Sequence, residues 1–316
     1  MKHPLQSYFY FNQSSTIVMR DDFGLVHVSR DAGASWVRPP QLKAEDYESI
    51  LLDPYRSKSR AYIIDDDSTT QFWTEDQGKT FNKFNVPLLA NRMGADAIST
   101  HATESSYLLW IGQKDCDSAI SPNCHSVAYV STNSGYSWKE IASYVTKCSF
   151  AREPEFARPS KDTILCQGFD VTIGNQHAMK ASTTARKLKR STNLGASWTT
   201  VLDSTISYAT AGEYMIAAQL EMGASEMKLF SSLDSVTWTR GTFEDDEKFP
   251  DYGYTLLDAS TGPAFVEVFG SKDLGAEFGT LYKSIDNAAQ RFKISLDAVN
   301  QDKKGYVVPS LSLLLR

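Results

Sequence analysis

The sequence predicts an all-β protein, a β-propeller made of four-stranded blades, and three observations lead to that prediction. An eight-residue motif recurs along the chain of 316 residues. Short segments rich in β-branched and aromatic residues separate its copies, as expected of strands, and no segment shows the apolar period of a long helix. Hydrophobic residues make up 41% of the chain and aromatic residues 12%, which suits a folded protein rather than a disordered one.

The recurring motif, which we call the box, reads Ser/Thr-x-Asp/Asn-x-Gly-x-Ser/Thr-Trp/Phe. Its four complete copies have their defining residues at Ser29, Asp31, Gly33 and Trp36; at Thr74, Asp76, Gly78 and Phe81; at Ser131, Asn133, Gly135 and Trp138; and at Ser191, Asn193, Gly195 and Trp198. Two eroded copies follow. The fifth runs from Ser231 to Trp238 with Leu233 and Ser235 where Asp and Gly belong, and the sixth keeps Ser284 and Asp286 before drifting toward Phe292.

Each position of the box has a physical role in a tight turn. The Asp or Asn side chain accepts hydrogen bonds from nearby backbone N–H groups and closes the turn. Glycine supplies the backbone conformation with positive φ that such a turn requires. The aromatic residue restarts an apolar strand and pins the hairpin onto a neighbouring layer.

The spacing of the boxes predicts one propeller blade per copy. They begin at residues 29, 74, 131, 191, 231 and 284, so that the intervals run from 40 to 60 residues, close to the 40–50 residues of a propeller blade with added loops. The strands expected between and beside the boxes are Tyr8–Phe11, Ser49–Leu52, Ala61–Ile64, Gln71–Trp73, Phe81–Val86, Tyr107–Ile111, Val127–Val130, Tyr214–Ala218 and Ala264–Phe269. We expect about six blades.

Charge and hydropathy exclude several classes of function. The net charge of −6 argues against general nucleic-acid binding, which needs a basic face. No apolar run approaches the ~20 residues that span a bilayer, so we expect no membrane span. The first residues of the chain show no signal-peptide pattern.

The four cysteines predict two disulfides. None belongs to a Cys-x-x-Cys pair and no histidine completes a metal-ligand pattern, so neither zinc nor any other metal site is expected. Four cysteines allow three pairings. We predict Cys116 with Cys124 and Cys148 with Cys166, because these bonds tie two polar inserts, 114–124 and 152–162, without a long crossing. Disulfides imply an oxidising compartment.

No residue pattern identifies a catalytic set or a cofactor site. Two of the four complete boxes carry Asn, which cannot act as a general acid, so their Asp and Asn residues are interpreted as turn closers. The acidic runs Asp65–Asp67 and Glu244–Glu247 are interpreted as solvated turns, although an acidic rim would attract basic propeptides. The histidines His27, His101, His125 and His177 share no spacing and have no nucleophile partner.

Two further segments have surface roles. Arg186–Arg190 is a basic run, Arg-Lys-Leu-Lys-Arg, which we interpret as a charged edge or outer strand that discourages sheet-to-sheet association; a ligand contact and a dibasic processing site are the alternatives. Asn12 heads a single glycosylation sequon, Asn-Gln-Ser, that requires entry into the secretory lumen.

The box together with the cysteine frame resembles the sortilin-type vacuolar protein sorting receptors over about residues 8–307. The segments that carry the resemblance are Cys116-Asp117, Cys124-His125, Ala128–Thr132, Glu140-Ile141, Lys147-Cys148, Ile164–Cys166, Phe292–Asp297 and Val299–Tyr306. The resemblance implies a ten-bladed propeller that binds protein or peptide cargo, such as soluble vacuolar hydrolases and propeptides, in the Golgi and endosome lumen. It implies no enzymatic activity, and full-length relatives are single-pass membrane proteins.

On this basis we expect residues 1–307 to form part of such a propeller, an incomplete arc, and residues 308–316 to be a divergent tail. No motif fixes the residues that contact cargo. The alternative function is a glycoside hydrolase or sialidase, because those enzymes also carry the box. It would require paired carboxylates about 5–9 Å apart, or a Tyr nucleophile with cationic neighbours, and no motif here supplies such a set.

Overall fold

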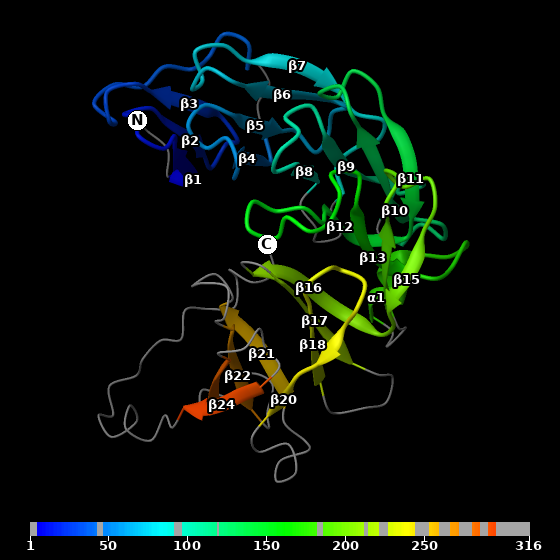
Figure 1. The fold of residues 1–316 in the computed structure, drawn as a ribbon. Coiled ribbons are helices and arrows are strands. Elements are labelled where there is room, and N and C mark those ends of the chain that lie inside the picture. Colours follow the sequence, from blue (N-terminus) through cyan, green and yellow to red (C-terminus); the bar gives the residue numbers. More distant parts are fainter. Residues whose placement is uncertain are drawn as a thin grey trace. The chain divides into compact units, whose positions relative to one another are not determined.

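The computed structural model describes residues 5–42, 47–91, 97–118, 120–181, 186–211, 214–220, 227–243, 253–258, 266–271, 280–284 and 290–294. Nearly all regular structure in these ranges is β-strand, organised in six sheets, and the one helix among them, α1 (Gln176–Ala181), has six residues (Figure 1). The all-β prediction is therefore confirmed. The chain forms two compact units, Met1–Asp117 with Ser126–Ala142 and Ser118–His125 with Ser143–Arg316.

The first unit holds three sheets. Sheet 1 contains β1 (Leu5–Tyr10), β2 (Ile17–Asp21) and β3 (Val26–Ser29). Sheet 2 contains β4 (Ser49–Leu52), β5 (Ala61–Ile64), β6 (Thr70–Thr74) and β7 (Asn82–Asn85). Sheet 3 contains β8 (Ile98–Thr100), β9 (Leu108–Lys114), β10 (His125–Ser131) and β11 (Lys139–Ser143).

The second unit holds the other three. Sheet 4 contains β12 (Val145–Phe150), β13 (Ile164–Phe169), β14 (Arg186–Ser191) and β15 (Thr199–Leu202). Sheet 5 contains β16 (Thr205–Ala211), β17 (Tyr214–Leu220), β18 (Met227–Ser232) and β19 (Thr239–Arg240). Sheet 6 contains β20 (Thr242–Phe243), β21 (Gly253–Asp258), β22 (Val266–Ser271), β23 (Thr280–Ser284) and β24 (Gln290–Ile294).

Within sheets 1 to 5 each strand pairs with the next in the chain, which is the meander of a propeller blade. Two sheets depart from the predicted four strands. Sheet 1 has three, and a single antiparallel bridge between Val28 and Val37 stands in place of the fourth. In sheet 6 the short strand β20 runs parallel to β24 as a fifth member.

Strand β5 shows how the sequence builds two cores at once. Its four residues, Ala-Tyr-Ile-Ile, are all buried, although side chains along a strand alternate between faces. Ala61 and Ile63 join a core shared with sheet 1, whereas Tyr62 and Ile64 join a core shared with sheet 3. Because both faces of β5 are covered, all of its residues are apolar and the run is continuous.

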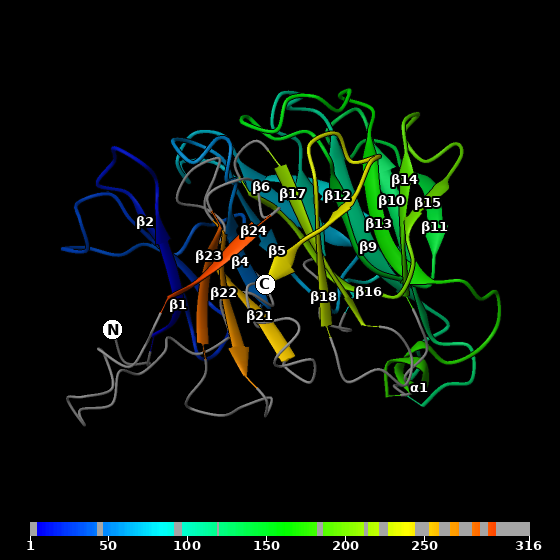
Figure 2. The same cartoon turned by 60° about the horizontal axis from the view of Figure 1, so that its bottom comes forward.

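The second unit has a comparable core between sheets 4 and 5. Leu188 from β14 packs there with Tyr208 from β16 and Met215 from β17. Phe156, from the insert between β12 and β13, is fully buried in the same cluster and anchors that loop. Helix α1 lies beside the start of sheet 4, where the Gln176 side chain donates to the Val145 carbonyl (Figure 2).

Candidate functional site

The box turns share one hydrogen-bond arrangement. The first hydroxyl, from Ser29 in the first box, donates to Asp31 Oδ1 at 2.8 Å and accepts the Gly33 N–H at 2.8 Å. The same carboxyl oxygen accepts the Ser35 N–H at 2.8 Å. The other three complete boxes repeat these contacts within 0.1 Å, with first hydroxyls at Thr74, Ser131 and Ser191.

Asp and Asn perform the same task with one bond reversed. In the first box the Ser35 hydroxyl donates to Asp31 Oδ2 at 2.6 Å. In the third box the Asn133 amide instead donates to the Ser137 hydroxyl at 2.9 Å. A hydroxyl can both donate and accept, so the turn tolerates either residue.

The carboxylates of the boxes are held ionised by these contacts. Hydrogen bonds, first from the Ser35 side chain and then from its backbone N–H, lower the pKa of Asp31 to about 2. For Asp76, burial acts to raise the pKa, but hydrogen bonds from Thr80 outweigh it and the pKa is lowered. A group with so low a pKa is a poor general acid at neutral pH.

Two consecutive residues of each complete box adopt left-handed backbone. In the third box these are Ser134, with φ of 57°, and Gly135, with φ of 84°. The N–H of the first such residue donates to the turn between the first two strands of the same sheet: Ala32 to Ser15, Gln77 to Ser59, Ser134 to Ser106 and Leu194 to Asp162, at 2.8–3.1 Å. Each box thereby ties the two turns at one end of its sheet together.

The fifth box corrects the alignment predicted from sequence. Ser232, not Ser231, supplies the hydroxyl, and Asp234 occupies the acceptor position assigned to Leu233. The Ser235 N–H donates to the Ser232 hydroxyl at 2.9 Å, three residues on instead of four. One residue has been lost, and with it one left-handed position, since Ser235 alone has positive φ there. In the sixth box Ser284 ends β23, and Asp286 lies outside the described residues.

The aromatic residues of the boxes differ in their surroundings. Phe81 is buried in the core between sheets 1 and 2. The Trp36 indole donates to the Gly33 carbonyl of its own turn at 3.0 Å, and the Trp138 indole donates to the Asn85 carbonyl of sheet 2 at 2.7 Å. Trp198 is the aromatic residue that follows the turn of the fourth box.

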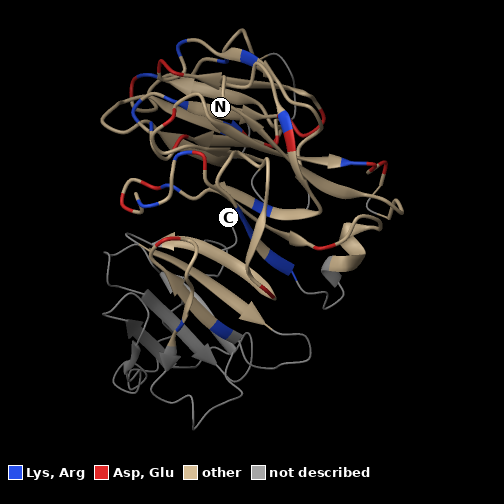
Figure 3. Cartoon of the chain, turned by 45° about the vertical axis from the view of Figure 1, so that its right-hand side comes forward, with Lys and Arg blue, Asp and Glu red and all other residues tan. Residues whose placement is uncertain are grey.

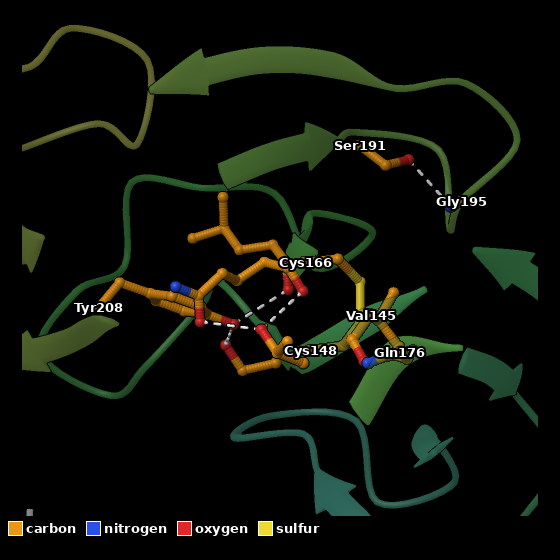
Figure 4. The surroundings of a disulfide bond; sticks show 11 residues. Val145, Cys148, Cys166, Gln176, Ser191, Gly195 and Tyr208 are labelled. Atoms are coloured by element: carbon orange, nitrogen blue, oxygen red, sulfur yellow. Dashed lines mark hydrogen bonds between the residues drawn. A yellow bond between two sulfur atoms is a disulfide. The ribbon is translucent and has the colours of Figure 1, made fainter. Parts of the chain in front are cut away.

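Both disulfides form as predicted. Cys148 and Cys166 face each other on β12 and β13, with a Cα–Cα distance of 4.1 Å (Figure 4). Cys116 and Cys124 are also disulfide-bonded, and no cysteine is free, so these two pair with each other. The nine-residue segment between and including them is therefore a closed loop.

A buried tyrosine, Tyr208, lies beside the second disulfide and is not among the predicted site residues. The Tyr208 hydroxyl donates to the Leu165 carbonyl at 3.1 Å and lies 3.0 Å from the Ser149 hydroxyl, which ties sheet 5 to sheet 4 (Figure 4). The Lys147 ammonium donates to the Tyr208 carbonyl at 2.9 Å and lies over its ring. Burial raises the pKa of Tyr208. No local motif marks this residue.

The basic run is not an edge strand, which corrects the prediction. It forms β14, paired with β13 on one side and β15 on the other. Lys187 and Lys189 both bind Asp170, at 2.9 and 3.0 Å, and hydrogen bonds from first Lys187 and then Lys189 lower the pKa of that carboxyl to about 2. Because the strand is paired on both sides, it does not offer the extended free chain that a processing protease needs. Basic and acidic residues are interspersed over the strands and loops (Figure 3).

The remaining polar candidates lie apart. Asp65 closes its own turn by accepting the Asp67 N–H at 3.0 Å, and Glu244–Glu247 lies outside the described residues. His27 contacts Asp21 on sheet 1, His101 caps a turn after β8, His125 stacks on Tyr144, and His177 lies on α1. Within the described ranges no group of His, Cys, Asp and Glu is placed to hold a metal ion.

Asn12 lies in the exposed turn between β1 and β2. Its side-chain amide donates to the Ser57 hydroxyl at 2.6 Å. Gln13, the middle residue of the sequon, has left-handed backbone with φ of 59°, and the Ser14 hydroxyl donates to the Gln77 side chain at 2.9 Å. None of the described helices is long and apolar enough to cross a membrane.

Solved structures show the likeness of the fold. The chain superposes on the GH74 enzyme of Niastella koreensis with a TM-score of 0.50 and 15% identity, covering 92% of this chain and 45% of that one. It superposes on oligopeptidase B of Trypanosoma brucei with a TM-score of 0.52 and 9% identity, covering 92% and 40%. At these identities the likeness concerns the propeller fold alone.

Curated relatives share more of the sequence. The chain is 29% identical over 305 residues to "Vacuolar protein sorting/targeting protein 10" of Mycosarcoma maydis, covering 94% of this chain. It is 31% identical over 312 residues to the protein of the same name from Aspergillus fumigatus, covering 96%. In both cases it spans 20% of the relative's length, about a fifth.

The model of one family, Sortilin-Vps10, described as "Sortilin, neurotensin receptor 3", matches residues 24–310. This range contains all six boxes and all four cysteines. A match over so much of the sequence, with the box turns and disulfides in place, shows that the chain belongs to the Sortilin-Vps10 family.

Proposed function

We propose that this chain provides part of the cargo-binding propeller of a sorting receptor, acting in the lumen of the Golgi and endosome. The cargo would be soluble vacuolar or lysosomal hydrolases, bound through peptide segments such as propeptides and carried toward the vacuole. The chain would bind without catalysing a reaction. Residues 1–307 would form the propeller part, and residues 308–316, which lie outside the described residues, the divergent tail.

The observation that carries the proposal is the family match over residues 24–310. The relatives are named for vacuolar protein sorting and targeting. The sheets support the same role, because repeated blades present many turns and strand edges from a rigid scaffold. Extended peptides bind such edges through main-chain hydrogen bonds.

The geometry of the boxes favours binding over glycoside hydrolysis. The two oxygens of Asp31 accept bonds from Ser29 and Ser35, so this carboxylate is engaged within its own turn. The third and fourth boxes carry an amide at this position, which serves the turn equally well and has no acid–base chemistry. In its four complete copies the box therefore serves the turn of its own sheet.

The disulfides support a lumenal location. Both pairs of cysteines are oxidised, and such bonds persist in the secretory pathway but are rare in the cytosol. Asn12 is exposed, so the same location would make it available for glycosylation.

Binding of a hydrolase precursor tests the proposal. The chain, produced through a secretory pathway, is immobilised and titrated with a soluble vacuolar protease carrying its propeptide. The mature protease lacking the propeptide is the control. We expect saturable binding of the precursor that free propeptide displaces. Two results would contradict the proposal. One is that the chain binds no member of a panel of precursors although its near-ultraviolet circular dichroism shows that it is folded. The other is that the chain hydrolyses a sialoside or glucan and loses this activity when one carboxylate is substituted.

Glycosylation of Asn12 is tested separately by mass. Secreted wild-type chain should lose the mass of one glycan on treatment with an N-glycosidase. Ser14→Thr keeps the sequon and should retain the glycan, whereas Ser14→Ala should lack it. A wild-type chain that is secreted without any glycan would refute the assignment of Asn12.

A further inference from the structure

In sheets 2 and 3 the residue that directly follows the first strand closes the next turn, with a carboxylate in sheet 2 and an imidazole in sheet 3. In sheet 2 Asp53 directly follows β4, and its Oδ1 accepts the backbone N–H groups of Tyr55 at 2.9 Å and Arg56 at 3.1 Å. In sheet 3 His101 directly follows β8 and does the same with Nδ1. It accepts the N–H of Thr103 at 3.0 Å and of Glu104 at 2.9 Å. The offsets of two and three residues are identical.

These contacts fix the protonation state of the histidine. A backbone N–H can only donate, so Nδ1 must present its lone pair and the ring proton must lie on Nε2. The His101 side chain is fully buried and meets the Tyr107 ring edge-on, with centroids 5.6 Å apart. The folded turn thus requires the neutral imidazole.

We propose that His101 makes the turn between β8 and β9 acid-sensitive, whereas the equivalent turn of sheet 2, which the Asp53 carboxylate closes, does not depend on an imidazole. Protonation of His101 places a third N–H donor at Nδ1, facing the two backbone donors. Either the turn then opens, or His101 stays neutral while the turn is folded. A carboxylate gains its proton near pH 4 and an imidazole near pH 6.5, so the two turns respond to different pH ranges.

The two guanidinium groups that reach this turn from sheet 2 bind its backbone carbonyls. From sheet 2, the Arg56 guanidinium donates to the His101 carbonyl at 2.9 Å, and the Arg60 guanidinium donates to the Ser105 carbonyl at 2.6 Å. The carboxylate of Asp53 faces its own turn and lies 3.7 Å from Arg56. Arg60 is paired with the carboxylate of Glu75.

On its own turn the acidic neighbour is Glu104, and the ring neighbour is Tyr107. Glu104 meets the imidazole through its backbone N–H. Two cations therefore face the carbonyls of this turn. Nδ1 accepts the backbone N–H groups of Thr103 and Glu104, and the Thr103 hydroxyl lies 3.4 Å from it. This arrangement favours the neutral ring over the charged one.

Opening of this turn would be felt on two sides. The Ser106 carbonyl accepts the Ser134 N–H of the third box at 2.8 Å. Opening of the turn would break this hydrogen bond to the box. The carbonyls of His101 and Ser105 are the acceptors for Arg56 and Arg60, which reach across from sheet 2. Protonation of one ring would therefore weaken the third box and the link between sheets 2 and 3 together.

The sign and size of the effect follow from proton linkage. The unfolded chain binds a proton at this ring below about pH 6.5 and the folded turn does not, so stability falls as the pH falls. One excluded proton changes the folding equilibrium by up to about tenfold per pH unit below that point. Between pH 7 and pH 5 the expected loss is about 25-fold.

Amide hydrogen exchange read residue by residue tests the proposal. After correction for the intrinsic pH dependence of exchange, the amides of Thr103 and Glu104 should lose protection between pH 7 and pH 5 in the wild-type chain. The amides of Tyr55 and Arg56, held by Asp53, provide the internal control and should keep theirs. His101→Asn offers an amide oxygen in the same place and does not titrate, so its Thr103 and Glu104 amides should stay protected at pH 5.

A second measurement separates this role from simple packing. Urea unfolding gives the folding constant at pH 7 and at pH 5. The factor by which this constant falls between the two pH values should be about 25-fold smaller in His101→Asn than in the wild type. His177→Asn, on helix α1, is the matched control and should keep the wild-type factor. The proposal fails if the wild-type Thr103 and Glu104 amides keep full protection at pH 5, or if His101→Asn shows the wild-type pH dependence.

Discussion

Replacing Gly135 by alanine separates two costs that the box turns impose on their glycine. Gly135 has a φ of +84°, and a Cβ built on it would lie 2.9 Å from Cδ2 of Phe84 on the neighbouring sheet. Gly33 occupies the same position of the first box with a φ of +93°, but its added Cβ would meet nothing nearer than 3.7 Å, at Trp36. The two positions share the backbone conformation and differ in the space beside it.

The expected magnitudes follow from these two terms. A left-handed backbone costs an alanine about 1–2 kcal/mol, and this is the whole expected effect of Gly33→Ala. At Gly135 the ring of Phe84 must also move in a packed core, which adds about 1–3 kcal/mol. Gly135→Ala should therefore lose about 2–5 kcal/mol, a large share of the roughly 5–15 kcal/mol that stabilises a typical domain.

Urea unfolding of the two variants beside the wild type measures the difference. Both midpoints should fall, with the m-value unchanged, and that of Gly135→Ala should fall further. Gly135→Ala combined with Phe84→Leu should recover part of the loss, since the smaller side chain leaves room for the methyl group. Equal destabilisation by the two single substitutions, within about 0.5 kcal/mol, would refute the argument from close approach.

Three further predictions concern the turn carboxylate, the disulfide and the buried tyrosine. Because hydrogen bonds hold the pKa of Asp31 at about 2, below its unfolded value near 3.9, its stabilisation is present above pH 4 and lost as the pH falls toward 2; Asp31→Asn should flatten this part of a pH–stability curve, and an unchanged curve would contradict it. Joint replacement of Cys148 and Cys166 by serine should cost about 3 kcal/mol in thermal unfolding, and reductant should then destabilise the variant less than the wild type, because only the Cys116–Cys124 bond remains to be reduced. Tyr208→Phe removes the donor to Leu165 and should cost about 1–2 kcal/mol by urea unfolding; an unchanged midpoint would show that the hydroxyl contributes nothing.

The periodic features of the fold were predictable from sequence because their physics is local. Ala61–Ile64 was expected as a strand and forms β5 with the same bounds. Tyr214–Ala218 lies within the longer strand β17. Short runs of β-branched and aromatic residues favour strands wherever they occur, and the box supplies its own turn. The pairing of Cys148 with Cys166 was predictable too, since a polar insert joins two strands that then face each other.

Other features depended on contacts that sequence order hides. The charges of Lys187 and Lys189 suggested an edge strand, but Asp170 pairs with both, and their long aliphatic stems tolerate a paired strand. Helix α1 has six residues, too few for an apolar period to be visible. The role of His101 becomes clear only when its turn is aligned on that of Asp53, although both residues directly follow a strand.

The fifth box shows that this turn can survive a deletion. It keeps its hydroxyl at Ser232 and its acceptor at Asp234 while one residue and the glycine position disappear. A shorter loop with a single left-handed residue, Ser235, still satisfies the same donors. Evolution can therefore trim such a hairpin without losing the blade, and searches keyed to the glycine spacing will undercount repeats in related chains. A search keyed instead to the hydroxyl and the acceptor two residues later would recover the shortened copies.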